Sequence, residues 1–288
     1  MYAQEVKSTG TLQTRSQMGA QEAAFQDKID AVNAYELGMK KTFAGRLIVN
    51  ASAFFNDFKD LQLNLSQLNA AGTAAANNFV NVDAEAYGLE LEVIWQPIRP
   101  LQLSASYGYL NTEITRGCCF YDPADPGALD PAATPSGGSA LSNGTRLVFQ
   151  TLEGSNLYQS PENKFAFNGN YTFDFTPGSL ILSASYTWTD ETIYQPFKSR
   201  DLVVPSYGVA DFRVLWNDID DRYTLIGFVK NAFDEEGYNS TSSTNPNAIF
   251  DQPNPGSAAT GTLTQTRTAI SRGLIQPRTY GVELQYRF

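Results

Sequence analysis

Apolar and polar residues alternate along much of the chain, and the alternation is clearest in the last eleven residues. Tyr280, Val282, Leu284, Tyr286 and Phe288 are apolar or aromatic, whereas the residues between them are polar or glycine. A period of two places these two sets on opposite faces of an extended strand. The pattern therefore predicts a C-terminal β-strand with one apolar face and one polar face.

The same alternation recurs upstream. It predicts eight further strands, over residues 33–40, 46–56, 87–95, 101–109, 165–175, 180–189, 208–216 and 222–231. A tenth, less regular strand is a candidate between Tyr2 and Leu12. The chain is therefore predicted to be all-β, with nine or ten strands.

The connections between these strands alternate in length. Short turns are predicted near 44–45, 97–100, 176–178 and 217–221, and long loops over 64–77, 116–163, 192–206 and 232–276. A β-sandwich has no reason to sort its loops in this way, whereas outer-membrane barrels have short periplasmic turns and long extracellular loops. Aromatic residues near the strand ends also suit the two interfacial girdles of such barrels. The pattern favours an antiparallel transmembrane β-barrel, with the apolar face toward lipid and Phe288 at the periplasmic end.

Composition narrows the function classes. No stretch approaches the ~18 consecutive apolar residues that a membrane helix needs. The net charge of −10 argues against nucleic acid as a partner, because phosphate binding needs clustered Lys and Arg. The chain contains no His, which removes the commonest general base and the usual zinc ligand. We therefore predict that the protein is not an enzyme and that it has no catalytic residue and no cofactor.

The only two cysteines, Cys118 and Cys119, are adjacent. They are expected to form a disulfide between neighbours or to remain two free thiols, and two soft ligands are too few for a metal site. Three nearby carboxylates do not follow the spacing of a calcium-binding loop; they are Asp122, Asp125 and Asp130. No metal site is predicted.

Four short motifs carry a resemblance to a known family. They are Y-E-L-G-M-K at 35–40, Y-G-L-E-L-E at 87–92, K-N-A-F-D-E at 230–235 and P-R-T-Y-G-V at 277–282. In this order they resemble the C-terminal barrel of TonB-dependent outer-membrane receptors, over residues 30–288. Residues 1–29 are an ill-defined N-terminal segment, a possible strand followed by a loop.

The resemblance implies a function and a location. Intact members of this family form a barrel of about 22 strands with an N-terminal plug in the lumen. They lie in the outer membrane of Gram-negative bacteria and import a scarce nutrient such as a siderophore-iron complex, cobalamin or an oligosaccharide. The implied partners are outer-membrane lipid, a small nutrient ligand, the TonB complex and the outer-membrane assembly machinery. The terminal strand is similar to the signal that this machinery recognises, matched here by Tyr280, Val282, Leu284, Tyr286 and Phe288.

The chain departs from the family pattern at its N-terminal side. It shows no secretory signal, no TonB-contacting segment and no plug. We therefore expect a C-terminal part of a receptor, which would reach the TonB complex only through the missing N-terminal part. Alone, it would leave two unpaired strand edges in lipid unless it closes as a smaller barrel or self-associates. The alternatives are a self-contained barrel of about ten strands that acts as a passive pore or adhesin, and a soluble β-sandwich with carbohydrate-binding loops.

Candidate ligand contacts lie in the first long loop. Guanidinium and aromatic groups suit acidic chelates and sugars, which selects Arg116, Tyr121, Arg146 and Tyr158. The alternative for each is a solvated loop residue without a ligand. Six charged residues on the polar face are expected to form salt-bridge networks: Glu90, Glu92, Asp211, Arg213, Glu283 and Arg287.

Overall fold

The computed structural model describes residues 2–7, 31–68, 75–122, 129–130, 146–147, 149–197, 202–243, 247–250, 263–267 and 270–288. These residues form strands and turns. None of them belongs to a helix long and apolar enough to cross a membrane.

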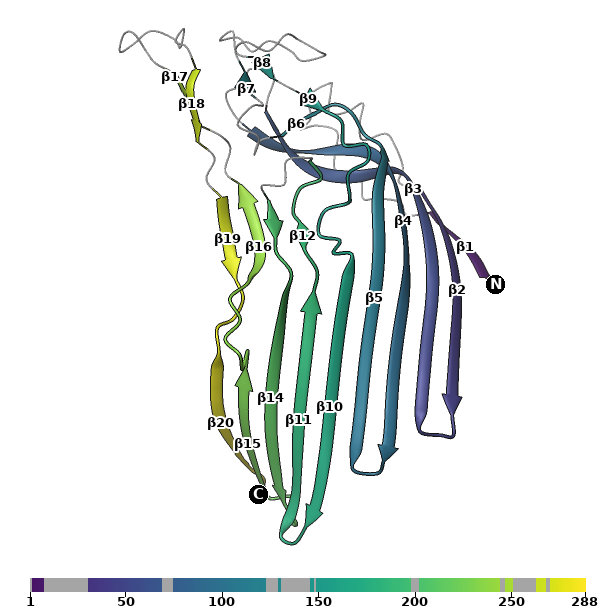
Figure 1. Ribbon diagram of the computed structural model, residues 1–288, viewed down its shortest axis with the longest axis vertical. Helices are drawn as coiled ribbons and strands as arrows, with labels where there is room; N and C mark the ends of the chain where they lie inside the picture. Colours follow the sequence, from purple (N-terminus) through teal and green to yellow (C-terminus); the bar gives the residue numbers. More distant parts are fainter. Residues whose placement is uncertain are drawn as a thin grey trace.

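One ten-stranded antiparallel sheet dominates the structure (Figure 1). In chain order its strands are β1 (Tyr2–Lys7), β2 (Ala31–Phe43), β3 (Leu47–Leu68), β4 (Ala75–Ile98), β5 (Leu101–Arg116), β10 (Asn163–Phe175), β11 (Gly178–Thr189), β14 (Tyr207–Asp218), β15 (Tyr223–Lys230) and β20 (Thr279–Tyr286). Their order in the sheet is the same as their order in the chain. The nine predicted strands are confirmed, and β1 covers the first part of the tenth candidate, whose residues 8–12 lie outside the described residues. The sheet remains open, with β1 and β20 at its two edges, as in part of a barrel.

Within the described parts of the long connections, five pairs of shorter strands are formed. They pair β6 (Phe120–Tyr121) with β9 (Phe149–Gln150), β7 (Leu129–Asp130) with β8 (Arg146–Leu147), β12 (Thr192–Ile193) with β13 (Val203–Val204), β16 (Tyr238–Ser243) with β19 (Ile270–Leu274), and β17 (Asn247–Phe250) with β18 (Leu263–Arg267).

The predicted sorting of short and long connections is present. The turns after β2, β4, β10 and β14 lie at one end of the sheet, and the long connections lie at the other (Figure 1). The C-terminus is at the end with the short turns, where the backbone N–H of Arg287 donates to the carbonyl of Arg222 over 2.9 Å. Phe288 therefore lies at the end of the sheet that carries the short turns, as the sequence predicts.

The prediction of a loop over 64–77 is wrong at both ends. β3 and β4 remain paired as far as Leu68 and Ala75. Leu63, Leu65 and Val80 in this extension are buried in an apolar cluster at the loop end of the sheet. This packing stabilises a hairpin whose alternation, Leu61-Gln62-Leu63-Asn64-Leu65, continues into the region predicted as loop.

The apolar residues of neighbouring strands lie on one continuous face. Because side chains alternate along each strand, the register determines which residues share a face. It pairs Leu89 with Ala53 and Tyr109, Leu182 with Tyr171 and Val214, and Leu284 with Leu225.

This apolar face is exposed. The exposed fractions are 54% for Leu89, in the middle of the sheet, and 80%, 77% and 67% for Tyr280, Val282 and Leu284 on β20. A sandwich would bury such a face against a second sheet. Exposed apolar side chains backed by a polar face are instead the pattern of a membrane barrel wall.

Aromatic rings form two belts on the apolar face. At the loop end, ring centroids are 6.4 Å apart for Tyr35 and Phe55, and 6.5 Å apart for Tyr87 and Tyr109. At the turn end, Tyr223 and Tyr286 are 5.1 Å apart. On β4, the stretch from Tyr87 to Trp95 is nine residues long with both rings included, a length with which a tilted strand spans the hydrocarbon layer.

Glycines in two of the motifs each lie under a ring of the neighbouring strand. Gly88 pairs with Phe54, and Gly281 pairs with Phe228. A Cβ at either glycine would overlap the ring of its partner. The glycines therefore provide the space in which the rings lie flat on the polar face.

Candidate functional site: the polar face and the loop end

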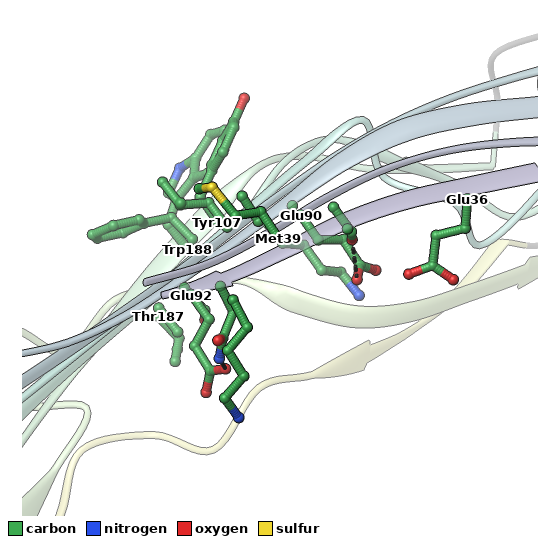
Figure 2. Close-up of a pocket in the computed structure, with 18 of the residues that line it drawn as sticks. Glu36, Met39, Glu90, Glu92, Tyr107, Thr187 and Trp188 are labelled. Atoms are coloured by element: carbon green, nitrogen blue, oxygen red, sulfur yellow. Dashed lines mark hydrogen bonds between the residues drawn. The ribbon is translucent and has the colours of Figure 1, made fainter. Parts of the chain in front are cut away.

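Residues of β2, β3, β4, β5, β10 and β11 line a pocket on the polar face of the sheet, with a volume of about 810 Å³. We call it the acidic pocket. Figure 2 shows Glu90 and Glu92 on one side of the strands and Met39 and Trp188 on the other. The charged and polar residues that line it are Glu36, Lys40, Asn50, Ser52, Glu90, Glu92, Ser106, Lys164, Thr187 and Thr189.

Strand pairing positions these groups. Asn50 faces Glu92 and Ser52 faces Glu90 across β3 and β4, so their side chains are neighbours on one face. The Asn50 amide donates to Oε2 of Glu92 over 2.7 Å, and the Ser52 hydroxyl lies 3.5 Å from Oε2 of Glu90. The lining of the pocket contains three carboxylates against two ammonium groups, so this part of the polar face is acidic.

The predicted salt-bridge network on the polar face is wrong for the part of the chain that the structure describes. Glu90 and Glu92 have neutral partners, Asp211 accepts the backbone N–H of Asn231, and Glu283 accepts the Gln285 amide. Asp211 and Arg213 are two positions apart on the same face of β14, but the Asp211 carboxylate is held by the N–H of Asn231 and the two do not form an ion pair. Glu283 is held in the same way by the amide of Gln285 on its own strand.

A smaller pocket of about 310 Å³, which we call the basic pocket, lies on the same face over β10, β11, β14 and β15. Its polar lining comprises Asn168, Asn170, Ser183, Ser185, Asp211, Arg213 and Lys230. The register places Asn170, Ser183 and Arg213 in one row across the three strands β10, β11 and β14.

Arg116 lies at the loop end of β5, where it binds two carboxylates. Its Nε and Nη2 donate to Oδ2 and Oδ1 of Asp83 over 2.7 and 2.8 Å, and Nη2 lies 2.9 Å from Oδ1 of Asp60. The backbone N–H of Asp60 also donates to Asp83 over 2.9 Å. We call these three residues the Arg116 clamp.

The clamp changes the acidity of its carboxylate. The hydrogen bond from Arg116 lowers the pKa of Asp83 below its ordinary value, burial opposes this shift, and the N–H of Asp60 adds to it. Asp83 lies on the loop side of the Tyr87 ring, beyond the spanning part of β4. The guanidinium uses Nε and Nη2 in the clamp, so the predicted ligand role of Arg116 depends on the N–H groups of Nη1.

The other three predicted ligand contacts also lie at the loop end. Tyr158 is half-buried and packs against the apolar cluster that contains Ile114 and Leu152. Tyr121 pairs with Phe149 in β6–β9, and Arg146 pairs with Asp130 in β7–β8; the side chains of Tyr121 and Arg146 lie outside the described residues.

Cys118 and Cys119 form a disulfide bond directly after β5. Of the two alternatives that the sequence left open, the structure has the bonded form. Asp122 is buried next to this segment, while Asp125 lies outside the described residues. No group of three or more His, Cys, Asp or Glu side chains is placed to hold a metal ion in the described ranges.

Sequence reasoning placed Glu90, Glu92, Asp211 and Arg213 of the two pockets on the polar face, but it missed other residues that line them. Lys40, Lys164, Asn168 and Asn170 occupy the polar positions of strands that were predicted correctly. The period-two pattern places them on the polar face, but alternation alone does not show which polar positions of neighbouring strands form a pocket. Asp60 was also missed, because it is far from Asp83 in sequence and the bulge that joins them has no local pattern.

The fold and the exposed apolar face define a part of a membrane-type β-barrel. The family model described as "TonB dependent receptor-like, beta-barrel" matches residues 31–232. The chain belongs to this family. None of the curated proteins compared matches the chain.

Solved structures share the fold at low sequence identity. The ferric yersiniabactin uptake receptor FyuA from Yersinia pestis has a TM-score of 0.58 at 16% identity, covering 90% of this chain and 30% of that one. The siderophore receptor PiuA from Acinetobacter baumannii gives 0.56 at 14%, covering 89% and 28%. The ferric-catecholate import receptor Fiu from E. coli K12 gives 0.55 at 15%, covering 97% and 30%. The chain thus spans about 30% of the length of these receptors.

Proposed function

We propose that this chain is the C-terminal barrel part of a TonB-dependent receptor that imports a ferric siderophore across the outer membrane of a Gram-negative bacterium. Family membership and the receptors of similar fold, which are described as ferric or siderophore receptors, support this function. The observation that carries it is the single-layer sheet, with an exposed apolar face for lipid and a polar face that bears two pockets.

Within this function, we place the ligand at the loop end. Arg116, Tyr121, Arg146 and Tyr158 are the proposed contacts, because the clamp and the adjoining apolar cluster hold this end of β5 in place. Coupling to the TonB complex would belong to the remainder of the receptor, since the chain spans about 30% of the structures it matches.

The exposed row on β20 is the proposed contact of the outer-membrane assembly machinery. Tyr280, Val282, Leu284 and Tyr286 share the apolar face, and the ring of Phe288 lies 6.0 Å from that of Tyr286. Strand edges that face lipid without partners are strongly unfavourable. The open edges at β1 and β20 therefore favour a part of a larger barrel over a self-contained pore or adhesin.

Disruption of the gene that encodes this chain, in its own bacterium, tests the proposed function. Under iron limitation the disrupted strain should lose uptake of a radiolabelled ferric siderophore, and the wild-type gene should restore it. Leu284→Arg should fail to restore uptake, because Arg on the lipid face inside the two aromatic belts costs about 2 kcal/mol. Gln285→Arg, on the polar face beside Glu283, is the matched control and should restore uptake.

Two results would contradict the proposal. One is unchanged uptake of every ferric siderophore tested after disruption. The other is recovery of the wild-type protein in the soluble fraction rather than in outer membranes.

A further inference from the structure

We propose that the turn end of β2–β5 binds an anionic phospholipid of the periplasmic leaflet through Lys41, Arg46 and Arg99, which we call the basic rim. Lys41 lies near the end of β2, Arg46 in the turn after β2, and Arg99 in the turn after β4. The lipid class is a glycerophospholipid whose headgroup carries a phosphate and no cation, such as phosphatidylglycerol. The inference goes beyond the proposed function and rests on it only for the lipid that surrounds the outer face of the sheet.

The first argument is the place of Lys41 on the apolar face. Lys41 shares this face of β2 with Met39 and Phe43, and it pairs with Val49 of β3. Among the described residues of β2–β5 between the two aromatic belts, Lys41 is the only charged residue on the apolar face. Its ammonium group lies 5.4 Å from the centroid of the Phe43 ring, on the side of the turn. Because a lysine on a lipid-facing surface extends its charged end to the headgroup layer, Lys41 marks the level of the lipid phosphates.

The second argument is that one residue joins the two turns that carry arginine. The backbone N–H of Gln96 donates to the carbonyl of Arg46 over 2.8 Å, and the side-chain amide of Gln96 donates to the carbonyl of Arg99 over 3.0 Å. The two turns are therefore held together at the same end of the sheet. Within the described ranges, no cation of the basic rim forms an ion pair. A bound phosphate would supply the missing negative charge.

The third argument is the contrast in charge along the turn end. Residues 41–49 and 93–106 contain the three cations of the basic rim and neither Asp nor Glu. Residues 216–223, around the turn after β14, instead contain three Asp against the single cation Arg222. An anionic headgroup is therefore attracted to the turns after β2 and β4 in preference to the turn after β14.

The fourth argument is a notch beside Arg99. β10 pairs with β5 only as far as Tyr171, which lies opposite Leu101, but β10 itself continues to Phe175. Figure 1 shows the β10–β11 hairpin extending past the turn between β4 and β5. This step between neighbouring turns forms a pocket of about 520 Å³, lined by Arg99, Pro100, Tyr171, Thr172, Phe173 and Asp174.

The lining of the notch suits both parts of a phospholipid headgroup region. Tyr171 and Phe173 share the apolar face, and their ring centroids are 4.4 Å apart, so they offer an apolar wall to the first carbons of the acyl chains. Arg99 offers a guanidinium, whose paired N–H groups match phosphate oxygens. Asp174, the one carboxylate among the described lining residues, can accept hydrogen bonds from the hydroxyl groups of a glycerol headgroup.

Native mass spectrometry of the intact receptor that contains this chain tests the proposal. The receptor would be extracted in mild detergent from the outer membranes of its own bacterium, stripped of lipid and titrated with phosphatidylglycerol or phosphatidylethanolamine. We expect saturable binding of phosphatidylglycerol, about tenfold tighter than that of phosphatidylethanolamine, whose ammonium group cancels the charge of its phosphate. Lys41→Gln, Arg46→Gln and Arg99→Gln should each weaken phosphatidylglycerol binding about fivefold. Arg99→Lys should lie between the wild type and Arg99→Gln, because it keeps the charge and loses the paired N–H groups.

The matched control is Arg222→Gln, which removes a cation at the acidic turn after β14 and should leave phosphatidylglycerol binding unchanged. Equal amounts of the variants in outer membranes would confirm that all of them are assembled. The proposal is overturned if the two lipids bind the wild type equally well, or if Arg222→Gln weakens binding as much as Arg99→Gln. It is also overturned if glycerol 1-phosphate, which has no acyl chains, displaces the lipid at equal concentration. Lipid binding is measured on the purified receptor and siderophore uptake in cells, so failure of this site and failure of the proposed function are distinguishable.

Discussion

Asn231 shows how one residue can join three strands. Its buried amide nitrogen donates to the carbonyls of Glu235 and Gln276 over 2.9 and 3.0 Å, and its Oδ1 accepts the N–H of Glu235. Its own N–H donates to Asp211 of β14. The end of β15 is thereby tied to β14 and to the segment that leads into β20. The positive φ of 49° at Asn231 is a conformation that Asn tolerates better than most residues.

Replacement of this residue should destabilise the C-terminal part of the sheet. Asn231→Ala removes the three hydrogen bonds that the buried Asn231 side chain makes with Glu235 and Gln276, and we expect a cost of about 3 kcal/mol. The measurement is the free energy of unfolding by urea in detergent micelles. Asn156→Ala, at an exposed Asn of a long connection, is the control. Equal midpoints for the two variants would contradict the role assigned to Asn231.

Residue-level prediction from the sequence succeeded where the period of two determines the result. The apolar set on β20 was assigned correctly because each strand position has only two possible faces. The motif K-N-A-F-D-E was recognised, but its role depends on Gln276 and Arg278, more than forty residues away. Contacts over such separations carry no local pattern.

At the scale of elements, the most distinctive feature is the bend in the β3–β4 hairpin. Figure 1 shows that both strands leave the direction of the sheet near their loop ends and cross above it. The register between them shifts between Phe58 and Leu61, and Asp60 has a φ of +54°. The Arg116 clamp lies at this point and holds Asp60 against Asp83. The bend is therefore fixed by a bulge and an ion pair together.

Removal of the clamp should loosen the hairpin without affecting the sheet. Arg116→Gln should lower the free energy of opening beyond Asp60 by about 1 kcal/mol, because the guanidinium is half exposed. Hydrogen exchange of residues 61–65 and 78–82 should become about fivefold faster, while exchange in β11 stays unchanged. Arg99→Gln, at a turn, is the control. Exchange rates equal to those of the wild type would show that the bulge alone fixes the bend.

The clamp also predicts a pH dependence. Because the pKa of Asp83 is lowered in the folded chain, its contribution to stability is fully present above the unfolded Asp value of about 3.9. It is lost as the pH falls through the lowered folded value. Hydrogen exchange of the hairpin in the wild type should therefore approach that of Arg116→Gln only in strong acid. The variant should show less dependence on pH over that range.

Element boundaries show what local patterns miss. The turns at residues 44–46, 99–100 and 176–177 were predicted within one or two residues, because Gly and Pro mark them. The extension of β3 and β4 was missed, because small residues around Ala75 suggested a loop. Burial against Phe120 and Leu152, far along the chain, stabilises the hairpin there.

At the scale of the whole molecule, one face of a single-layer sheet is left uncovered by the residues that the structure describes. The apolar side chains of this face are exposed along strands that run from one edge of the sheet to the other, and aromatic belts lie at both ends. Such an apolar surface is far larger than a soluble monomer tolerates. The proposed function gives this face a hydrocarbon environment, and the membership of the chain in the TonB-dependent receptor-like β-barrel family agrees with that proposal.

The sequence predicted this architecture because two of its patterns run along the whole chain. Short and long connections alternate between the strands, and apolar and polar residues alternate within them. It did not predict the charge separation on the polar face, since that depends on which strands become neighbours. Lys164 lies in the acidic pocket and Lys230 in the basic one, although each occupies the same kind of polar strand position.

Spin labelling along β11 in lipid bilayers tests the central claim most directly. Single cysteines would be introduced from Leu182 to Thr187 in a chain whose Cys118 and Cys119 are replaced by Ser. Collision with oxygen, which dissolves in lipid, should be high at Leu182, Ala184 and Tyr186, and collision with a water-soluble nickel complex should be high at the three positions between them. Low collision with both reagents at the apolar positions would show a dry protein core in place of lipid, and would contradict the account.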